Sequence, residues 1–359
     1  MKSKRKYYQE PYLSKLNTRV SGKHEDTSGV WYTFEDTIFY PEGGGQSSDR
    51  GLVNGLSVAD VKERDGGVWH LVAGALDGDV EMHLDWELRF SNMQQHTGQH
   101  ILSACFKDMH DLDTVSVHLG RGETMIELDS GHISDQVLAE TEIRANQLIR
   151  ENHPVNPVWL HRKDLDKYHL RRDIKSDSDE IRLVQIGELD SVGCGGIHVR
   201  TTAEIGLIKI SGWEMIRNHV RVKAKIGVSA YTYFAQLHTV LAQIGNQFSA
   251  ALEDLPERVE SCLRETRELS AQNKRVTDLW LSAYAKTLSI PEIDGCFKLA
   301  ELSKDHLKTI SEYWLNLNQR PCLFISNMEG KTNFFMRIPE NSPIDIQEFM
   351  KQGRDQFAL

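Results

Sequence analysis

The sequence predicts an α+β protein: a small N-terminal β-barrel, an α+β domain with a metal site, long helices, and a small C-terminal α/β domain. Three observations support this. Strand-like runs broken by turns extend from Val30 to about Trp86, and helical and strand-like runs mix over 87–227. After Gly227, apolar residues recur every three or four positions from Leu237 to Leu269. A chain of 359 residues has room for two to three domains. We therefore expect the parts 1–86, 87–227, 228–286 and 287–359.

The composition is that of a globular chain that folds in water. Hydrophobic residues make up 40% and charged residues 26%, which excludes general disorder. No apolar stretch approaches the roughly 18–20 residues of a membrane span, and no apolar region follows the basic start MKSKRK, so we expect neither a membrane segment nor a secretory signal. Five scattered cysteines argue against a disulfide framework and favour a reducing cytoplasm.

The net charge of −10 counts against a protein that coats nucleic acid through bulk electrostatics. Two segments are locally basic: the start, with Lys2, Lys4, Arg5 and Lys6, and the run HRKDLDKYHLRRDIK at 161–175. Each is more typical of a solvated surface than of a binding site.

The first part alternates β-formers with turn residues. From Val30 to about Trp86, the runs WYTF, TIFYP and VWHLV are separated by GGG and DGG. Short strands at this spacing predict a small barrel or sandwich.

The second part mixes both periods. We expect a helix over 91–107, begun near Ser91 or Asn92, and a second over 134–151 with Ser134 or Asp135 as its cap. The runs VNPVWL, EIRLVQIG and IGLIKISGW read as strands. Together they predict helices packed on one antiparallel sheet.

After Gly227 the apolar spacing predicts one long helix or a helical hairpin, with Asp254 and Pro256 suited to begin a second helix. We expect residues 229–285 to pair two copies of the chain or to brace the C-terminal domain. The expected core-facing positions are Leu241, Ile244, Phe248, Val259, Cys262 and Leu269. The alternating runs CFKLAEL, KDHLKTISEYWLNL, PCLFISN, NFFMRI and DIQEFMKQ then predict the small α/β domain.

Two pairs of side chains have the spacing of metal ligands. His96 and His100 lie four residues apart on the predicted helix, so both imidazoles leave one face. Cys194 and His198 flank the run GGI, whose glycines let both side chains converge. Three imidazoles and a thiolate form a ligand set that Zn²⁺ prefers. A zinc peptidase is disfavoured, because Thr97 stands where a catalytic glutamate would follow the first histidine.

The run FYPEGGGQSSDRG at 39–51 places three glycines after a strand. Such glycines let a backbone approach a ligand closely, although a hairpin turn is the simpler interpretation. It is not a phosphate loop, because no Gly-Lys-Ser/Thr follows.

Taken together, DTIFYPEGGGQSSDRG at 36–51, RFSNMQQHTGQHIL at 89–102 and LDSVGCGGIHV at 189–199 resemble the free-standing alanyl-tRNA editing proteins, long form. These are relatives of the editing domain of alanyl-tRNA synthetase. The resemblance is strongest in the first 227 residues and looser in the helices and tail that follow.

The resemblance implies that His96, His100, Cys194 and His198 bind zinc. It also implies a substrate pocket beside Ile197, Thr37 and the glycine-rich motif, whose members are Gly43, Gly44, Gly45 and Gln46. Two departures stand out. The usual CGGTH reads CGGIH, so Ile197 replaces a hydroxyl, and the C-terminal glycine-rich motif is reduced to KQGRDQFAL.

The implied reaction is ATP-independent, zinc-dependent hydrolysis of mischarged tRNA, namely serine or glycine carried by alanine-type tRNA. Four protein ligands close a tetrahedral zinc shell, so a catalytic zinc would need one ligand to bind weakly or give way to water. No general base is evident, and Asp190 is better suited to hold a ligand histidine. The alternative is a non-catalytic, zinc-stabilised tRNA-binding or assembly protein. The hypothesis of a general esterase has less support, since no G-x-S-x-G motif is present.

Overall fold

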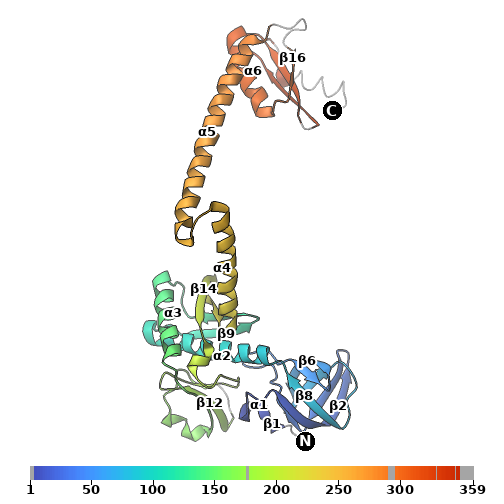
Figure 1. Ribbon diagram of the computed structural model, residues 1–359, viewed down its shortest axis with the longest axis vertical. Helices are drawn as coiled ribbons and strands as arrows, with labels where there is room; N and C mark the ends of the chain where they lie inside the picture. Colours follow the sequence, from blue (N-terminus) through green and yellow to red (C-terminus); the bar gives the residue numbers. More distant parts are fainter. Residues whose placement is uncertain (1–3, 175–177, 290–295, 329, 344, 348–359) are drawn as a thin grey trace. The chain divides into compact units, whose positions relative to one another are not determined.

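The computed structural model describes residues 4–174, 178–289, 296–328, 330–343 and 345–347 (Figure 1). The chain divides into two compact units, Met1–Val240 and Leu241–Leu359. The first unit holds the expected parts 1–86 and 87–227, and the division falls inside a helix of the expected part 228–286. Among the described helices, none combines the length and the apolar character that crossing a membrane requires.

The first unit begins with antiparallel strands that pair in a closed order. They are β2 (Lys15–Asp26), β3 (Gly29–Phe34), β5 (Gly51–Val53), β6 (Leu56–Arg64), β7 (Gly67–Val72) and β8 (Asp79–Leu84). The order is β2-β3-β7-β6-β5-β8, and β8 pairs back with β2 in a closed barrel. Alternate residues of β7 and β8 are buried, as expected for strands with one face turned inward. Before and beside it lie β1 (Lys4–Arg5), α1 (Lys6–Gln9) and β4 (Asp36–Thr37).

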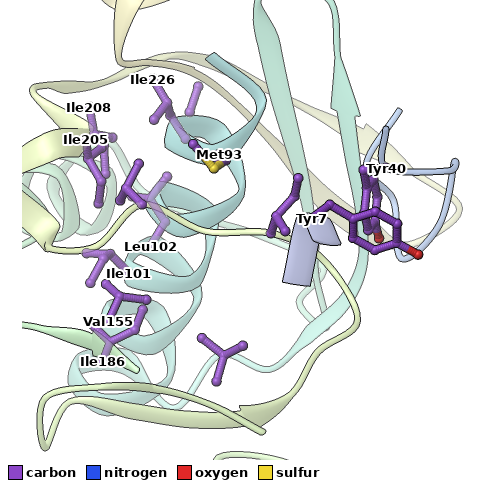
Figure 2. Close-up of a cluster of buried hydrophobic side chains, with 14 of the residues drawn as sticks. Tyr7, Tyr40, Met93, Ile101, Leu102, Val155, Ile186, Ile205, Ile208 and Ile226 are labelled. Carbon is purple, nitrogen blue, oxygen red and sulfur yellow. The ribbon is translucent and has the colours of Figure 1, made fainter. Parts of the chain in front are cut away.

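Helix α2 (Trp86–His110) is longer than the sequence indicated. The prediction of a start near Ser91 or Asn92 is wrong, because the side chain of Asp85 accepts a hydrogen bond from the amide of Leu88 and caps the helix. Almost every residue from Arg89 to Phe106 is buried, so α2 lies inside the unit rather than on its surface. Figure 2 shows buried side chains of α2 close to isoleucines of neighbouring segments.

Two antiparallel sheets, rather than the single expected one, accompany α2 and α3 (Asp135–Arg150). Strands β9 (Thr114–Gly120), β10 (Glu123–Leu128), β14 (Ile208–Ile216) and β15 (His219–Ile226) pair in the order β14-β15-β10-β9. Strands β11 (Val155–His161), β12 (Glu180–Ile186) and β13 (Asp190–Gly193) form the other sheet. The single-sheet interpretation is wrong because β14 and β15 pair with a hairpin far upstream, β9–β10, instead of with β11–β13. Short 3-10 turns, η1 (Arg162–Lys167) and η2 (Thr202–Ile205), connect these elements.

The helical region contains two helices, α4 (Val228–Phe248) and α5 (Leu255–Thr287), separated by the 3-10 turn η3 (Leu252–Asp254). Asp254 and Pro256 stand at the start of α5, as the sequence indicated. Within one chain the expected core-facing positions are not a core: Leu241, Val259, Cys262 and Leu269 are exposed. Ile244 and Phe248 are half-buried. The role of residues 229–285 in pairing two chains or in bracing the C-terminal domain stays a prediction.

The second unit ends in a small α/β domain. Strands β16 (Cys296–Ala300), β17 (Cys322–Met328) and β18 (Lys331–Arg337) form one sheet, and α6 (Lys304–Asn318) packs beside the end of α5 (Figure 1). Leu281, Trp314 and Phe324 belong to their shared core. The tail KQGRDQFAL and most of DIQEFMKQ lie outside the described residues.

Candidate metal centre

The four predicted ligands meet. His96 and His100 come from α2, and Cys194 and His198 come from the loop that follows β13. Their ligand atoms all lie within 4.8 Å of one another, and they could hold a metal ion. Sγ of Cys194 lies 3.3 Å from Nε2 of His96 and 3.4 Å from Nε2 of His198. A tetrahedral shell with bonds of about 2.0–2.3 Å requires ligand separations of about 3.3–3.8 Å, so these two pairs already have suitable spacing.

The Nδ1 atom of each histidine, which points away from the centre of the cluster, forms a hydrogen bond with a different part of the fold. Nδ1 of His96 lies 2.9 Å from Oε1 of Gln46, and Nδ1 of His100 lies 3.2 Å from Oδ2 of Asp190. Both partners are acceptors, so each Nδ1 carries a proton and each Nε2 keeps its lone pair for the centre of the cluster.

Thr97 orients the third histidine. Its hydroxyl donates to the carbonyl of Met93 at 2.9 Å, so the oxygen can only accept from its other neighbours. These are Nδ1 of His198 at 3.1 Å and the amide of Val199 at 3.2 Å. Nδ1 of His198 therefore carries the proton, and all three imidazoles present Nε2 inward.

Burial and mutual charge shape the protonation of the cluster. Burial opposes ionisation of Cys194, but the neighbouring His96, the largest opposing influence, holds the pKa of this thiol well below the usual value, which favours a thiolate. Burial lowers the pKa of His198 to about 3, so this imidazole is neutral at pH 7. For Asp190, burial raises the pKa, but hydrogen bonds from His100 and Arg171 outweigh it and leave the carboxyl with a lowered pKa. Thiolate, neutral imidazole and oriented carboxylate are the forms that metal binding needs.

The loop CGGIH is held by groups from two elements. Nη1 of Arg182 donates to the carbonyls of Cys194 at 2.7 Å and Gly196 at 2.6 Å, and the hydroxyl of Tyr8 donates to the carbonyl of Gly195 at 2.8 Å. Gly196 lies against the ring of His96 so closely that a Cβ atom there would be 2.0 Å from Cε1. The second glycine of CGG is thus required by contact with a ligand.

The glycine-rich run forms a hairpin turn that touches the cluster. The amides and carbonyls of Gly43 and Gln46 bond to each other at 3.1 and 3.0 Å, and Gly44 and Gly45 have φ values of 60° and 83°. Two consecutive positive φ angles are typical of a type I′ turn and favour glycine. Gly45 also accepts a hydrogen bond from Leu119 of β9. The turn delivers Gln46, whose Oε1 accepts from His96 and from the amide of Ile197.

Two residues expected beside the pocket are engaged elsewhere. Thr37 is fully buried, and its hydroxyl lies 2.8 Å from Nε2 of His70 in the barrel. Since Nδ1 of His70 faces the carbonyl of Tyr32, the hydroxyl of Thr37 is the donor in this pair. Ile197 is 1% exposed and its side chain belongs to the main core. The roles of Thr37 and Ile197 in reading a substrate stay predictions.

Sequence reasoning missed a buried ion pair that joins the glycine-rich segment to α2. The guanidinium of Arg89 contacts both carboxylate oxygens of Asp49, and both residues are at most 1% exposed. Arg89 also donates to the carbonyls of Pro11 and Ile38. Removing one partner of a buried pair costs about 3–5 kcal/mol. Only the presence of opposite charges in two neighbouring motif segments could have indicated it.

Solvent reaches the cluster on the side of Cys194. Cys194 is half-buried while the three histidines are at most 5% exposed. A cavity of about 710 Å³ opens beside Cys194 and Gly195 and is also lined by Arg172, Ile174 and Arg182. A second cavity of about 420 Å³ includes Asp190 and residues 167–171. The second half of the basic run 161–175 therefore borders these cavities: 167–171 line the smaller one and 172–174 the larger one. Lys175, like Lys2, lies outside the described residues.

The sequence matches known proteins in the same region. Residues 181–223 match the family described as the threonyl and alanyl tRNA synthetase second additional domain. The chain is 31% identical to the alanyl-tRNA editing protein AlaX-L of Pyrococcus horikoshii, over 77% of this chain and 70% of that protein. It is 34% identical to the alanyl-tRNA editing protein Aarsd1 of Bos taurus, over 72% of this chain and 60% of that protein. It is 27% identical to the alanine–tRNA ligase of Pyrobaculum aerophilum, over 84% of this chain and 36% of the ligase.

The match over 181–223 covers the segment that supplies Cys194 and His198, so the fold and the cluster define a protein related to these synthetase additional domains. The identity and coverage go further: the chain belongs to the family of alanyl-tRNA editing proteins.

Proposed function

We propose that this protein hydrolyses the ester bond of mischarged aminoacyl-tRNA, with serine or glycine on alanine-type tRNA as its substrates and with Zn²⁺ bound by His96, His100, Cys194 and His198. The observation that carries the proposal is the convergence of the four side chains in a member of a family of editing proteins. The partner would be tRNA in the cytoplasm, and the four parts 1–86, 87–227, 228–286 and 287–359 would be its domains.

The donor set fits zinc. A thiolate and neutral imidazoles suit a borderline-soft ion, and the three outer hydrogen bonds fix each ring with Nε2 inward. When bound, the ion would polarise a carbonyl or orient the substrate. An aminoacyl ester is already activated, so positioning and stabilisation of developing negative charge would supply most of the remaining acceleration.

Gln46 is the side chain best placed to meet the substrate. Its Oε1 is committed to His96 and Ile197, whereas its Nε2 is buried and has no hydrogen-bond partner within the described part of the chain. A buried unpaired donor costs about 1–3 kcal/mol, which a substrate carbonyl or a serine hydroxyl would recover. A serine-reading contact would serve discrimination between amino acids. An enzyme whose pocket is made to attach alanine to tRNA rejects glycine and serine only weakly, so a separate hydrolytic site must supply the remaining discrimination.

The second candidate, a non-catalytic tRNA-binding or assembly protein, is favoured by one feature. Four protein ligands close a tetrahedral shell, as in structural zinc sites. In that case the ion would fix the CGGIH loop and the protein would bind tRNA without turnover.

Purified protein incubated with seryl-tRNA and glycyl-tRNA of the alanine type distinguishes the two candidates. We expect hydrolysis that is lost after treatment with a chelator and restored by zinc, and Cys194→Ala should lose metal and activity together. Cys262→Ala is the matched control, because that thiol is exposed on α5. Tight tRNA binding with no release of amino acid in the zinc-loaded protein would refute the deacylase and leave the binding protein.

A further inference from the structure

Trp159 is an exposed aromatic side chain close to the metal cluster. It lies on β11 and is 57% exposed, although tryptophan is usually well buried. The rings of Tyr8 and Trp159 lie nearly perpendicular, with a centroid distance of 5.7 Å and an interplanar angle of 80°. This perpendicular contact holds the indole in place without covering it by stacking.

A row of side chains leads from Trp159 to the cluster. Trp159 is directly opposite Arg182 in the β11–β12 pairing, so the two share one face of the sheet. Across the next strand, the amide of Cys194 bonds to the carbonyl of Arg182. Two strand spacings separate the indole position from the ligand cysteine, about 10 Å along the sheet. A nucleoside joined through its ribose can bridge such a span.

The middle of the row carries a cation with no carboxylate partner among the described residues. Arg182 is 7% exposed, its Nη1 binds the carbonyls of Cys194 and Gly196, and its Nε has no partner within the described residues. Among the described ion pairs, none includes Arg182. Its guanidinium lies 4.8 Å from the ring centroid of Tyr8, which in turn bonds to the loop at Gly195. Sites for single-stranded nucleic acid combine such a cation with an aromatic platform.

We infer that Trp159, held by Tyr8, is the platform on which the 3′-terminal nucleobase of the tRNA stacks, with Arg182 facing the ribose and phosphate between that base and the metal cluster. The inference rests on the proposed function, because it assumes that an RNA 3′ end reaches the cluster. Stacking would anchor the nucleoside, and the amino acid esterified to its ribose would then extend toward Cys194. Trp159 acts here in binding and specificity, since no reacting atom touches it.

The test uses a hairpin RNA that carries no amino acid, ends in single-stranded CCA and is labelled at its 5′ end. A matched RNA has the same sequence, but its terminal ribose lacks the base. Fluorescence anisotropy with zinc-loaded, full-length protein gives both affinities. We expect Trp159→Ala to weaken binding of the CCA hairpin about fivefold to a hundredfold, and to leave binding of the abasic RNA unchanged. Trp159→Phe should retain most of the affinity, because a smaller aromatic face remains.

Trp280→Ala is the matched control, since Trp280 is also half exposed and also contacts a tyrosine, but it lies on α5. It should leave both affinities unchanged. The inference is overturned if Trp159→Ala binds the CCA hairpin like the unaltered protein, as it would if the indole served a protein partner. Equal losses on both RNAs would also overturn it. Because the RNA carries no amino acid, the result does not depend on hydrolysis. If the protein stacks the base but has no activity, the proposal of the platform stands and only the proposed deacylase function fails.

Discussion

Gly196→Ala is the substitution for which the structure gives the most direct expectation. The added Cβ atom would lie 2.0 Å from Cε1 and 2.2 Å from Nδ1 of His96, and 3.0 Å from Oε1 of Gln46. Ordinary van der Waals contact begins near 3.4 Å, so the imidazole or the loop must move by more than 1 Å. His96 is 2% exposed and its ring is closely surrounded, which leaves no free space for that movement.

A displacement of this size is incompatible with an intact metal shell. Ligand distances tolerate deviations of about 0.2 Å, and loss of a group that merely orients a ligand already lowers metal affinity about 10- to 100-fold. We expect Gly196→Ala to lose at least this much zinc affinity, measured by competition with a chromogenic chelator. The chelated protein should lose about 1–3 kcal/mol of unfolding free energy through overpacking, measured in urea.

Gly195→Ala supplies the control. The nearest atom to its added Cβ is the hydroxyl of Tyr8 at 3.9 Å, an ordinary contact, and neither glycine has a positive φ. It should bind zinc like the unaltered protein. If the two variants showed the same zinc affinity, the contact between Gly196 and His96 would not govern the site and the reasoning would fail.

Four further predictions concern other parts of the molecule. Asp190→Asn should lower zinc affinity about 10- to 100-fold in the same competition assay, because the carboxylate that orients a ligand histidine is lost. Burial lowers the pKa of His70 to about 4, so between about pH 6.5 and pH 4 the unfolded chain binds this proton and the folded chain does not. The free energy of unfolding, measured in urea, should therefore fall by about 2 kcal/mol from pH 7 to pH 5. In the variant His70→Gln this pH dependence should be absent. Ile197→Thr should cost about 1–3 kcal/mol of stability and leave seryl-tRNA deacylation ordinary, whereas a gain above about tenfold would show that the hydroxyl reads the substrate. Light scattering of the unaltered protein should give the mass of two chains. The double variant Leu263→Glu and Val276→Glu, on the exposed side of α5, should give the mass of one chain. A single-chain mass for the unaltered protein would leave for residues 229–285 only the role of bracing the C-terminal domain.

The ligands were predictable because their spacing is local. His96 and His100 share a helix face, and Cys194 and His198 share a glycine-containing loop, so each half of the cluster is encoded within five residues. Their convergence was indicated only by the family resemblance, since no local rule brings residues 96 and 194 together. The cap of α3 at Ser134 and the start of α5 beside Asp254 and Pro256 were predictable for the same local reason.

The features that sequence reasoning missed depend on contacts between distant segments. Thr97 was considered only as a residue that is not a catalytic base, yet its hydroxyl orients His198, and Arg182 appeared to be one charge within a strand. The start of α2 was misplaced because Asp85 follows directly after a strand, where a cap and a turn look alike. Which strands share a sheet is set by pairings across about a hundred residues, as between β10 and β15.

The three outer partners of the histidines come from separate elements, and this arrangement links metal binding to the packing of the first unit. Gln46 is delivered by the glycine-rich turn, Thr97 by α2, and Asp190 by β13. The buried pair of Arg89 and Asp49 ties the first two of these elements together independently of the ligands. A metal ion bound at the centre would therefore stabilise a junction that the ion pair already holds, and we expect its removal to loosen the CGGIH loop first. The platform at Trp159 is attached to that loop through Tyr8 and Arg182, which makes the geometry of RNA binding depend on the same junction.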